Sequence, residues 1–233
     1  MNINEAIQLL KELIQIPSFS QKEHKTADLL EIFLKGKNVE VQRNGNNVWV
    51  VNKHFTPNKP TILLNSHHDT VKPNAGYTND PFLAIEAEGK LFGLGSNDAG
   101  GALVSLIATF LHYYDQELAY NLVLAATAEE EISGAKGISS ILPELSPIDF
   151  AIVGEPTLMQ MAIAEKGLMV LDCTVTGQAG HAARNEGDNA IYKAMKVIDW
   201  FKTYQFEKVS ETLGPIKMSV TQIEAGTQHN VVP

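Results

Sequence analysis

The feature that most constrains the fold is an alternation of short apolar runs with helical patterns over the first two thirds of the chain. Three runs have the length and composition of strands buried on both faces: residues 61–64, 122–126 and 150–153. Apolar residues at helical spacing surround these runs over three segments: residues 3–16, 20–36 and 102–114. Strands that alternate with helices predict a three-layer α/β domain with a mostly parallel sheet.

Local signals set further boundaries. Pro17 ends the first helical pattern. Ser20 and Glu23 have the spacing of a capping box, which predicts the start of the second helix. Two further strands are predicted over residues 39–41 and 48–51, and a short helical stretch over residues 135–142.

Beyond Thr157 the pattern changes character. Residues 167–176 alternate as a half-buried strand, residues 189–201 have the spacing of an amphipathic helix, and residues 218–223 resemble another strand. We therefore expect a smaller α+β unit here. Cys173, the only cysteine, is expected as a buried thiol in the first of these strands, and it excludes an intrachain disulfide and a Cys-rich zinc site.

Composition excludes several other classes. The 18 Lys and Arg residues against 27 Asp and Glu give a net charge of −9, and no basic stripe is present, so nucleic acid is not an expected partner. No apolar run is long enough to span a bilayer, and the amino-terminal segment has an amphipathic pattern rather than that of a signal sequence. We therefore expect a soluble, cytoplasmic protein without a membrane partner. No Gly-x-Ser-x-Gly elbow supports covalent catalysis.

Imidazole and carboxylate groups follow the first buried run. Residues two apart on a strand share a face, so His67 and Asp69 point to one side and His68 to the other. His67 is therefore the better metal ligand, and Asp69 can accept its second ring N–H. A surface His-His-Asp turn remains the alternative.

Asp98 stands where a dinucleotide-binding fingerprint would have its third glycine. A carboxylate would repel the pyrophosphate there, so binding of a nicotinamide cofactor is the weaker alternative. A bridging position between two metals suits Asp98 better. An Asp that caps the following helix is a further alternative, compatible with a ligand role.

Three consecutive glutamates, Glu129 to Glu131, follow the second buried run, and Glu155 follows the third. Like charges at one sheet edge would raise one another's pKa unless cations neutralise them. One carboxylate can hold a metal while its neighbour takes a proton from water. Together with His67 and Asp98, these groups are the inventory of a two-metal hydrolytic site.

These motifs resemble the M20 metallopeptidase superfamily, in particular its branch of acetylornithine deacetylases and succinyl-diaminopimelate desuccinylases. The resemblance runs along nearly the whole chain. Besides Asp98, it is carried by six strings: Ser-His-His-Asp-Thr-Val at 66–71, Asp-Pro-Phe at 80–82, Gly-Lys-Leu-Phe-Gly-Leu-Gly at 89–95, Thr-Ala-Glu-Glu-Glu at 127–131, Gly-Glu-Pro-Thr at 154–157 and Gly-Gln-Ala-Gly-His at 177–181.

The resemblance implies a zinc-peptidase-like catalytic domain over residues 1–164 and a partial lid or dimerisation domain over residues 165–233. It implies hydrolysis of the amide bond of an N-acyl amino acid, with N-acetylornithine first and N-acetyl- or N-succinyl-citrulline next, in arginine biosynthesis. A dipeptidase or aminopeptidase of the same superfamily is the near alternative. A truncated, non-catalytic metal-binding or interaction module is the alternative from another class.

The same resemblance implies two zinc ions, with Co²⁺ or Mn²⁺ as possible substitutes. Asp98 would bridge them, with His67 and Glu155 on one metal and Glu131 on the other.

It also implies two catalytic residues, in addition to Asp69, whose support of His67 follows from the strand geometry. Glu130 would be the general base, with Glu129, one residue earlier, as the alternative. Asp69 would support the site, and His181 would act across a homodimer to stabilise the oxyanion of the partner's substrate.

Two departures from the family accompany the match. Ala99, Gly100 and Gly101 replace a usual lysine, which we take as neutral for metal binding. The family's last metal-binding histidine is expected beyond residue 233, and neither His181 nor His229 is placed to replace it. We therefore expect an amino-terminal portion of a longer enzyme, with little activity alone.

Overall fold

This computed structural model describes residues 1–145 and 147–233. The chain separates into two compact units, Met1–Met159 and Gln160–Pro233, and each is described by itself. Among the described residues, no helix has both the length and the apolar character needed to cross a membrane.

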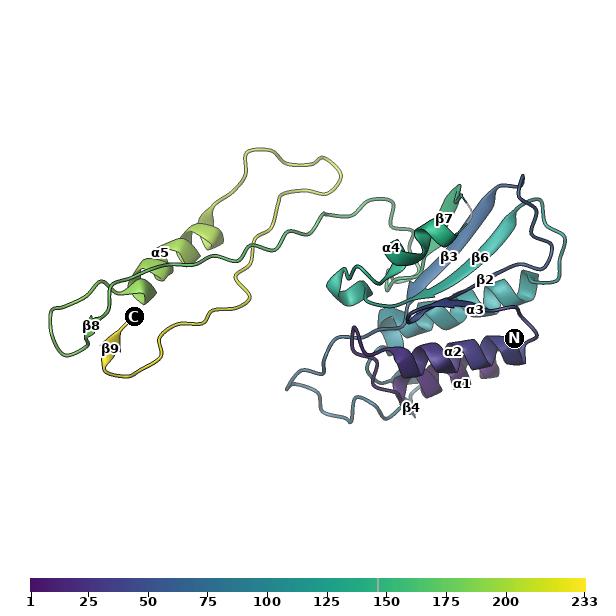
Figure 1. The fold of residues 1–233 in the computed structure, drawn as a ribbon, viewed down its shortest axis with the longest axis horizontal. Helices are drawn as coiled ribbons and strands as arrows, with labels where there is room; N and C mark the ends of the chain where they lie inside the picture. Colours follow the sequence, from purple (N-terminus) through teal and green to yellow (C-terminus); the bar gives the residue numbers. More distant parts are fainter. Residues whose placement is uncertain (146) are drawn as a thin grey trace. The chain divides into compact units, whose positions relative to one another are not determined.

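A five-stranded sheet forms the centre of the first unit (Figure 1). Its strands, in spatial order, are β1 (Gln42–Asn44), β2 (Asn47–Val51), β6 (Asn121–Thr127), β3 (Thr61–His67) and β7 (Phe150–Val153). β3 lies parallel to both β6 and β7, whereas β2 runs antiparallel to β6 and to β1. The predicted α/β architecture with a mainly parallel sheet is confirmed.

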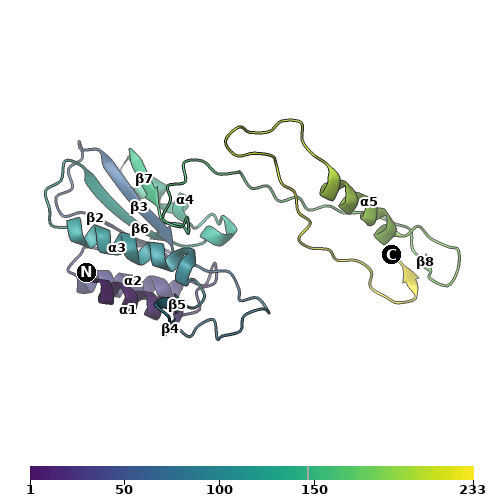
Figure 2. The same ribbon diagram turned by 180° about the vertical axis from the view of Figure 1, so that it is seen from behind.

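Helices cover both faces of this sheet. Three long helices lie on one face: α1 (Ile3–Ile14), α2 (His24–Gly36) and α3 (Gly101–Tyr113). The short helix α4 (Ile138–Ile141), which the turn η3 (Leu142–Glu144) follows in the chain, lies on the other, as the view from behind also shows (Figure 2). The layers predicted from the alternating pattern are therefore present.

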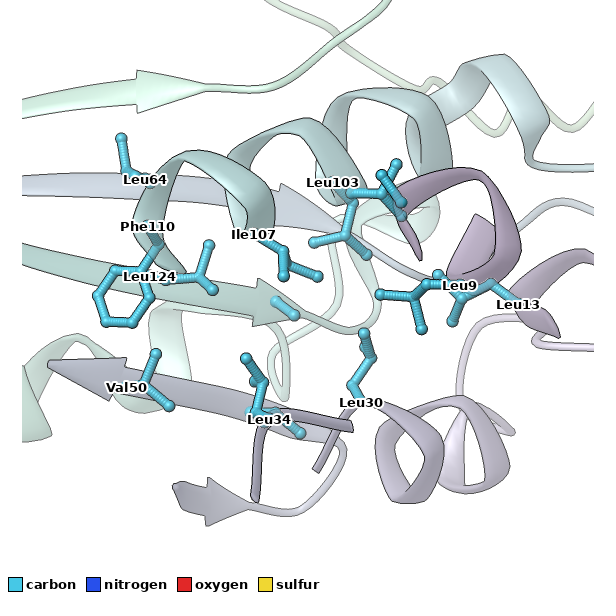
Figure 3. Close-up of a cluster of buried hydrophobic side chains, with 14 of the residues drawn as sticks. Leu9, Leu13, Leu30, Leu34, Val50, Leu64, Leu103, Ile107, Phe110 and Leu124 are labelled. Atoms are coloured by element: carbon cyan, nitrogen blue, oxygen red, sulfur yellow. The ribbon is translucent and has the colours of Figure 1, made fainter. Parts of the chain in front are cut away.

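The central strands are buried on both faces because alternate side chains enter different cores. Leu122 and Leu124 of β6 pack in the larger cluster with α1, α2 and α3 (Figure 3). Val123 and Ala125 pack with Trp49 and Ile141 in a smaller cluster on the other face. Full burial of an aliphatic side chain contributes about 1.5–3 kcal/mol, so this double core fixes the sheet register firmly.

β7 differs from its prediction as a buried strand. Phe150 and Val153 are 60% and 56% exposed. β7 lies at the edge of the sheet and pairs with β3 alone. An apolar run cannot by itself distinguish a central strand from an edge strand, which explains the difference.

The first strand is also displaced from its prediction. The structure places β1 at Gln42–Asn44 rather than at residues 39–41, because the hairpin turn pairs Asn44 with Asn47. Val39 is buried, and its backbone N–H donates to Leu34 O at the end of α2 instead.

The predicted capping box at Ser20 and Glu23 is wrong. α2 begins at His24, and Glu23, the residue before it, makes no side-chain cap. The Ser20 hydroxyl donates to Asp69 Oδ2 at 2.8 Å. Long-range partners therefore displace the local capping bonds that the spacing predicted.

An unpredicted hairpin precedes α3. It consists of β4 (Ile85–Ala87) and β5 (Lys90–Phe92), and a kinked turn, η1 (Ser96–Gly100), connects it to α3. Gly95 begins this turn with φ 76°, and a Cβ there would lie 2.7 Å from Thr70 Cγ2. Glycine is therefore required at this position by backbone conformation and by space.

The second unit contains α5 (Ala190–Thr203) and a small pair of strands, β8 (Gly180–His181) and β9 (Val231–Val232). The predicted helix at 189–201 is confirmed, and Asn189 caps it by accepting from the N–H groups of Ile191 and Tyr192.

The strands predicted at 167–176 and 218–223 are wrong, as is the buried thiol, because Cys173 is exposed. A strand needs a neighbour to bond its N–H and C=O groups, and the described part of the chain pairs neither segment with one.

Candidate metal centre

The carboxyl ends of three parallel strands bring His67, the three glutamates 129–131 and Glu155 to one edge of the sheet. His67 is the last residue of β3 and pairs with Thr127 of β6. The glutamate turn, residues 129–133, follows β6 and therefore begins level with His67. Glu155 follows β7 after a single glycine. This edge is where open α/β sheets bind ligands.

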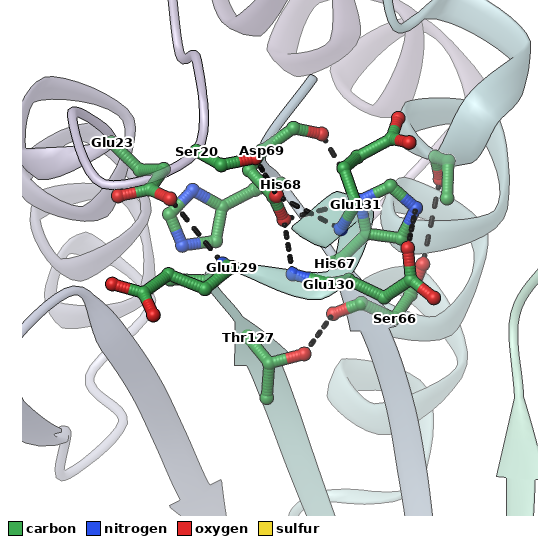
Figure 4. A network of polar contacts seen from close by, with 12 residues as sticks. Ser20, Glu23, Ser66, His67, His68, Asp69, Thr127, Glu129, Glu130 and Glu131 are labelled. Atoms are coloured by element: carbon green, nitrogen blue, oxygen red, sulfur yellow. Dashed lines mark hydrogen bonds and ion pairs between the residues drawn. The ribbon is translucent and has the colours of Figure 1, made fainter. Parts of the chain in front are cut away.

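The ring of His67 is fully buried and held at both nitrogens (Figure 4). Nδ1 lies 3.0 Å from the backbone oxygen of Asp69 and 3.4 Å from its Oδ1. Because both atoms are acceptors, Nδ1–H donates to them, and Nε2 is the nitrogen that faces the carboxylates of the site. Nε2 lies 3.1 Å from Asp98 Oδ1. This is the arrangement that metal-binding histidines normally have.

His68 points away from this centre, as the strand alternation predicts. Its Nδ1 lies 2.8 Å from Thr26 Oγ1, and its Nε2 lies 2.9 Å from Asn46 O. His67, His68 and Asp69 are all buried, so the alternative of a surface turn is wrong.

Asp69 connects the imidazole to the glutamate turn. Its Oδ1 accepts from the backbone N–H of Glu130 at 3.1 Å, and its Oδ2 accepts from that of Glu131 at 3.2 Å. Burial alone would raise the pKa of Asp69, but the hydrogen bonds from His67, Ser20 and Glu130 outweigh it and lower the pKa. Asp69 is therefore an ionised anchor for two parts of the site.

Asp98 lies in the kinked turn η1, with non-helical backbone angles. It makes no cap for α3 and faces His67 instead, so the capping alternative does not account for it.

Three predicted ligands form a compact donor set. The ligand atoms of His67, Asp98 and Glu131 all lie within 4.8 Å of one another. Donors that bind zinc at 2.0–2.2 Å in a tetrahedron lie about 3.3 Å apart, so the 3.1 Å between His67 and Asp98 fits a shared metal. Nitrogen and carboxylate donors also match the preferences of zinc.

Two further carboxylates lie beside this set. Glu130 Oε2 is 3.8 Å from His67 Nε2, and Glu155 Oε1 is 3.9 Å from it. Both residues were predicted from their positions at strand ends.

The charges and burial of this cluster raise the pKa values of three of its side chains. A bound cation would oppose each of these shifts. Burial opposes a proton on His67, but Asp69, Glu155 and Glu130 outweigh burial and raise its pKa to about 9. Burial and the charge of Asp98 raise the pKa of Glu131. Burial, with the charges of Glu130 and Asp98, raises that of Glu155 against the influence of His67. The carboxylates therefore repel one another unless a cation neutralises their charge.

Glu129 lies apart from the ligand cluster. Its side chain is buried, its φ is 53°, and its Oε2 accepts from Lys136 N at 3.2 Å. Figure 4 shows it turned toward Glu23 and His68.

His181 belongs to the second unit. It lies exposed in β8, where its Nδ1 accepts from Ala183 N at 3.1 Å.

The sequence interpretation missed the residues that hold the site from behind. Glu23, Thr26 and Asn46 contact Glu129 or His68 through bonds that span 22 to 106 residues. No local pattern signals such pairs, and the apparent capping box at Glu23 suggested a different role.

The chain is similar to known proteins. Residues 63–221 match the family described as Peptidase family M20/M25/M40. The chain is 36% identical over 198 residues to an acetylornithine deacetylase of Proteus mirabilis, covering 79% of this chain and 51% of that protein. It is 34% identical over 240 residues to a protein of Mycobacterium tuberculosis described as a succinyl-diaminopimelate desuccinylase, covering 98% and 65%. The chain thus spans between half and two thirds of these relatives.

A solved structure shares the fold. The crystal structure of a tripeptidase from Staphylococcus aureus superposes with a TM-score of 0.59 at 21% identity, covering 100% of this chain and 64% of that one.

Proposed function

Because the chain belongs to the peptidase family M20/M25/M40, we propose that it carries the metal centre of an amidohydrolase that cleaves an N-acyl amino acid. The observation that carries this proposal is the His67, Asp98 and Glu131 donor set with a further carboxylate, Glu130, beside it. The 36% identity to an acetylornithine deacetylase supports N-acetylornithine as substrate, and with it a cytoplasmic role in arginine biosynthesis.

Two divalent metals, zinc first, are proposed for the complete site. Asp98 would bridge them, His67 and Glu155 would hold one, and Glu131 would hold the other. Bound there, the metals would supply Lewis acidity, which polarises an amide carbonyl and makes water more acidic.

Glu130 is proposed as the general base. Its exposed carboxylate takes a proton from the attacking water while the water oxygen bonds to the carbonyl carbon. It then gives that proton to the amide nitrogen as the C–N bond breaks, which leaves a carboxylate and a free amine. Asp69 supports both partners, because it fixes the tautomer of His67 and accepts from the backbone N–H of Glu130.

Glu130 is favoured over Glu129 by its surroundings. Glu130 is exposed beside His67, whereas Glu129 is buried and bonded to Lys136 N. His181 is proposed to donate to the developing oxyanion across a homodimer, an interaction worth a few kcal/mol for one donor.

Turnover of a substrate panel by the full-length, zinc-loaded protein tests this proposal. We expect the highest kcat/KM on N-acetylornithine, lower values on N-succinyl-diaminopimelate and on a dipeptide, and loss of all activity in Glu130→Gln. A preference for the dipeptide would indicate a peptidase instead. Zinc binding without turnover of any substrate would indicate a non-catalytic module and overturn the proposal.

A further inference from the structure

A fully buried carboxylate, Glu23, lies behind the metal centre at the start of α2 and has no part in the proposed reaction. Three N–H groups from three separate segments point at it. Gln21 N donates to Oε1 at 2.6 Å, Asn46 Nδ2 donates to Oε2 at 2.8 Å, and Glu129 N lies 3.3 Å from Oε1. A buried carboxylate is costly unless it is hydrogen-bonded in this way.

The third of these bonds reaches the first residue of the glutamate turn. Glu129 and Ser133 have φ values of 53° and 49°, and they flank the turn η2 (Glu130–Ile132). Left-handed backbone is disfavoured for residues with a Cβ, so such a turn persists only where its surroundings hold it. The carboxylate of Glu23 accepts from the backbone N–H of Glu129, and that of Asp69 accepts from the N–H groups of Glu130 and Glu131.

The position of Glu23 is itself fixed by its neighbours. The ring of His68 lies between Thr26 Oγ1, one turn along α2, and the backbone oxygen of Asn46. Asn46 in turn donates to Glu23. This links the start of α2, the β1–β2 hairpin and the end of β3 into one support for the turn.

We propose that Glu23 is a positioning residue of the metal centre, whose buried carboxylate fixes the backbone of Glu129 and thereby the directions of Glu130 and Glu131. It acts through the turn and touches neither metal nor substrate. The inference rests on the proposed roles of Glu130 as base and Glu131 as ligand. The turn requires an acceptor oxygen at the distance that the side chain of a glutamate or glutamine reaches.

Two substitutions in the full-length protein separate length from charge. Glu23→Gln keeps the length and an oxygen that can accept from Gln21 N and Glu129 N. Its NH2 group faces Asn46, whose amide must turn so that its oxygen accepts from the new donor. Glu23→Asp keeps the charge but is one methylene too short to reach Glu129. We expect Glu23→Gln to retain kcat within about threefold. Glu23→Asp should lower kcat about a hundredfold with little change in KM, because misplacing a catalytic group by about 1 Å usually has this effect. Its dissociation constant for zinc should rise about tenfold or more.

Leu34→Ala is the matched control for a loss of stability. Leu34 lies on the same helix, is 1% exposed and packs in the larger core cluster, which includes no residue of the glutamate turn. It should lower Tm and leave kcat and zinc affinity unchanged.

The proposal is overturned if Glu23→Asp matches Leu34→Ala in kcat and zinc affinity, or if Glu23→Gln is impaired as much as Glu23→Asp. A Glu23→Asp protein that does not fold while Leu34→Ala does would assign Glu23 to folding and likewise overturn it. Zinc binding by calorimetry needs no substrate, so it tests Glu23 even if no substrate is turned over and the proposed function fails.

Discussion

Adjacent glutamates at the end of β6 have different surroundings and therefore different proposed tasks. Glu131 belongs to the donor set with His67 and Asp98, whereas Glu130 is exposed beside it. The backbone N–H groups of both donate to one carboxylate, that of Asp69, so their relative orientation is fixed by a single anchor.

Exchanging each glutamate for glutamine should separate these tasks. Glu130→Gln should keep zinc and lower kcat about a hundredfold to ten-thousandfold, the usual range for a positioned acid–base group. Glu131→Gln should lose zinc, because an amide is a weaker ligand. Metal analysis beside steady-state kinetics measures both effects. Glu129→Gln is the control, and if it kept zinc but lost activity while Glu130→Gln lost zinc, the two roles would shift by one residue.

The charge state of His67 predicts how zinc binding depends on pH. Its pKa of about 9 means that the metal-free site holds a proton at neutral pH, which zinc must displace. Zinc affinity should therefore rise with pH, by about tenfold per unit between pH 7 and 8, as competition with a chromophoric chelator would show. A flat profile there would contradict a proton on His67 in the metal-free site.

The stability of the metal-free protein should fall as pH rises, whereas its zinc affinity rises. The folded-state pKa of His67 is raised above its ordinary value of 6.5, so the charged ring stabilises the fold fully below about pH 6.5. That contribution is lost as pH rises through about 9. Urea unfolding across this range in His67→Gln, which has no titrating ring, provides the control.

At the level of elements, the sheet is built by strands whose two faces enter separate cores. The sequence predicted β3 and β6 because both faces are apolar. It did not distinguish β7, whose run is as apolar but which lies at the edge. The predicted strand at 167–176 failed for a related reason, since alternation shows which side chains share a face and not whether a neighbouring strand exists.

Truncating one side chain in each kind of strand tests this difference. Leu124→Ala in β6, at 1% exposure, should lower the free energy of unfolding by about 2–5 kcal/mol. Phe150→Ala in β7, at 60% exposure, should cost less than about 1 kcal/mol. Urea unfolding of both variants gives the comparison. Equal costs would show that β7 is covered in the protein.

At the scale of the whole molecule, the site residues could be predicted because parallel strands deliver their carboxyl ends to one edge. This rule and side-chain chemistry were enough to predict His67 and the glutamates that follow β6 and β7. Asp98 instead lies in the turn η1, and the division of roles among the glutamates came from the family resemblance. The support behind them could not be predicted, since the bond from Glu23 to Glu129 spans 106 residues and leaves no periodic pattern.

Metal analysis combined with activity is the most direct test of the central claim that this sheet edge is a hydrolytic metal centre. The full-length protein should hold two zinc ions per site, lose hydrolysis of N-acetylornithine on removal of the metal by a chelator, and regain it when zinc is restored. His67→Ala should bind less zinc and remain inactive. Full activity in the metal-free protein, or undiminished zinc in His67→Ala, would contradict the account.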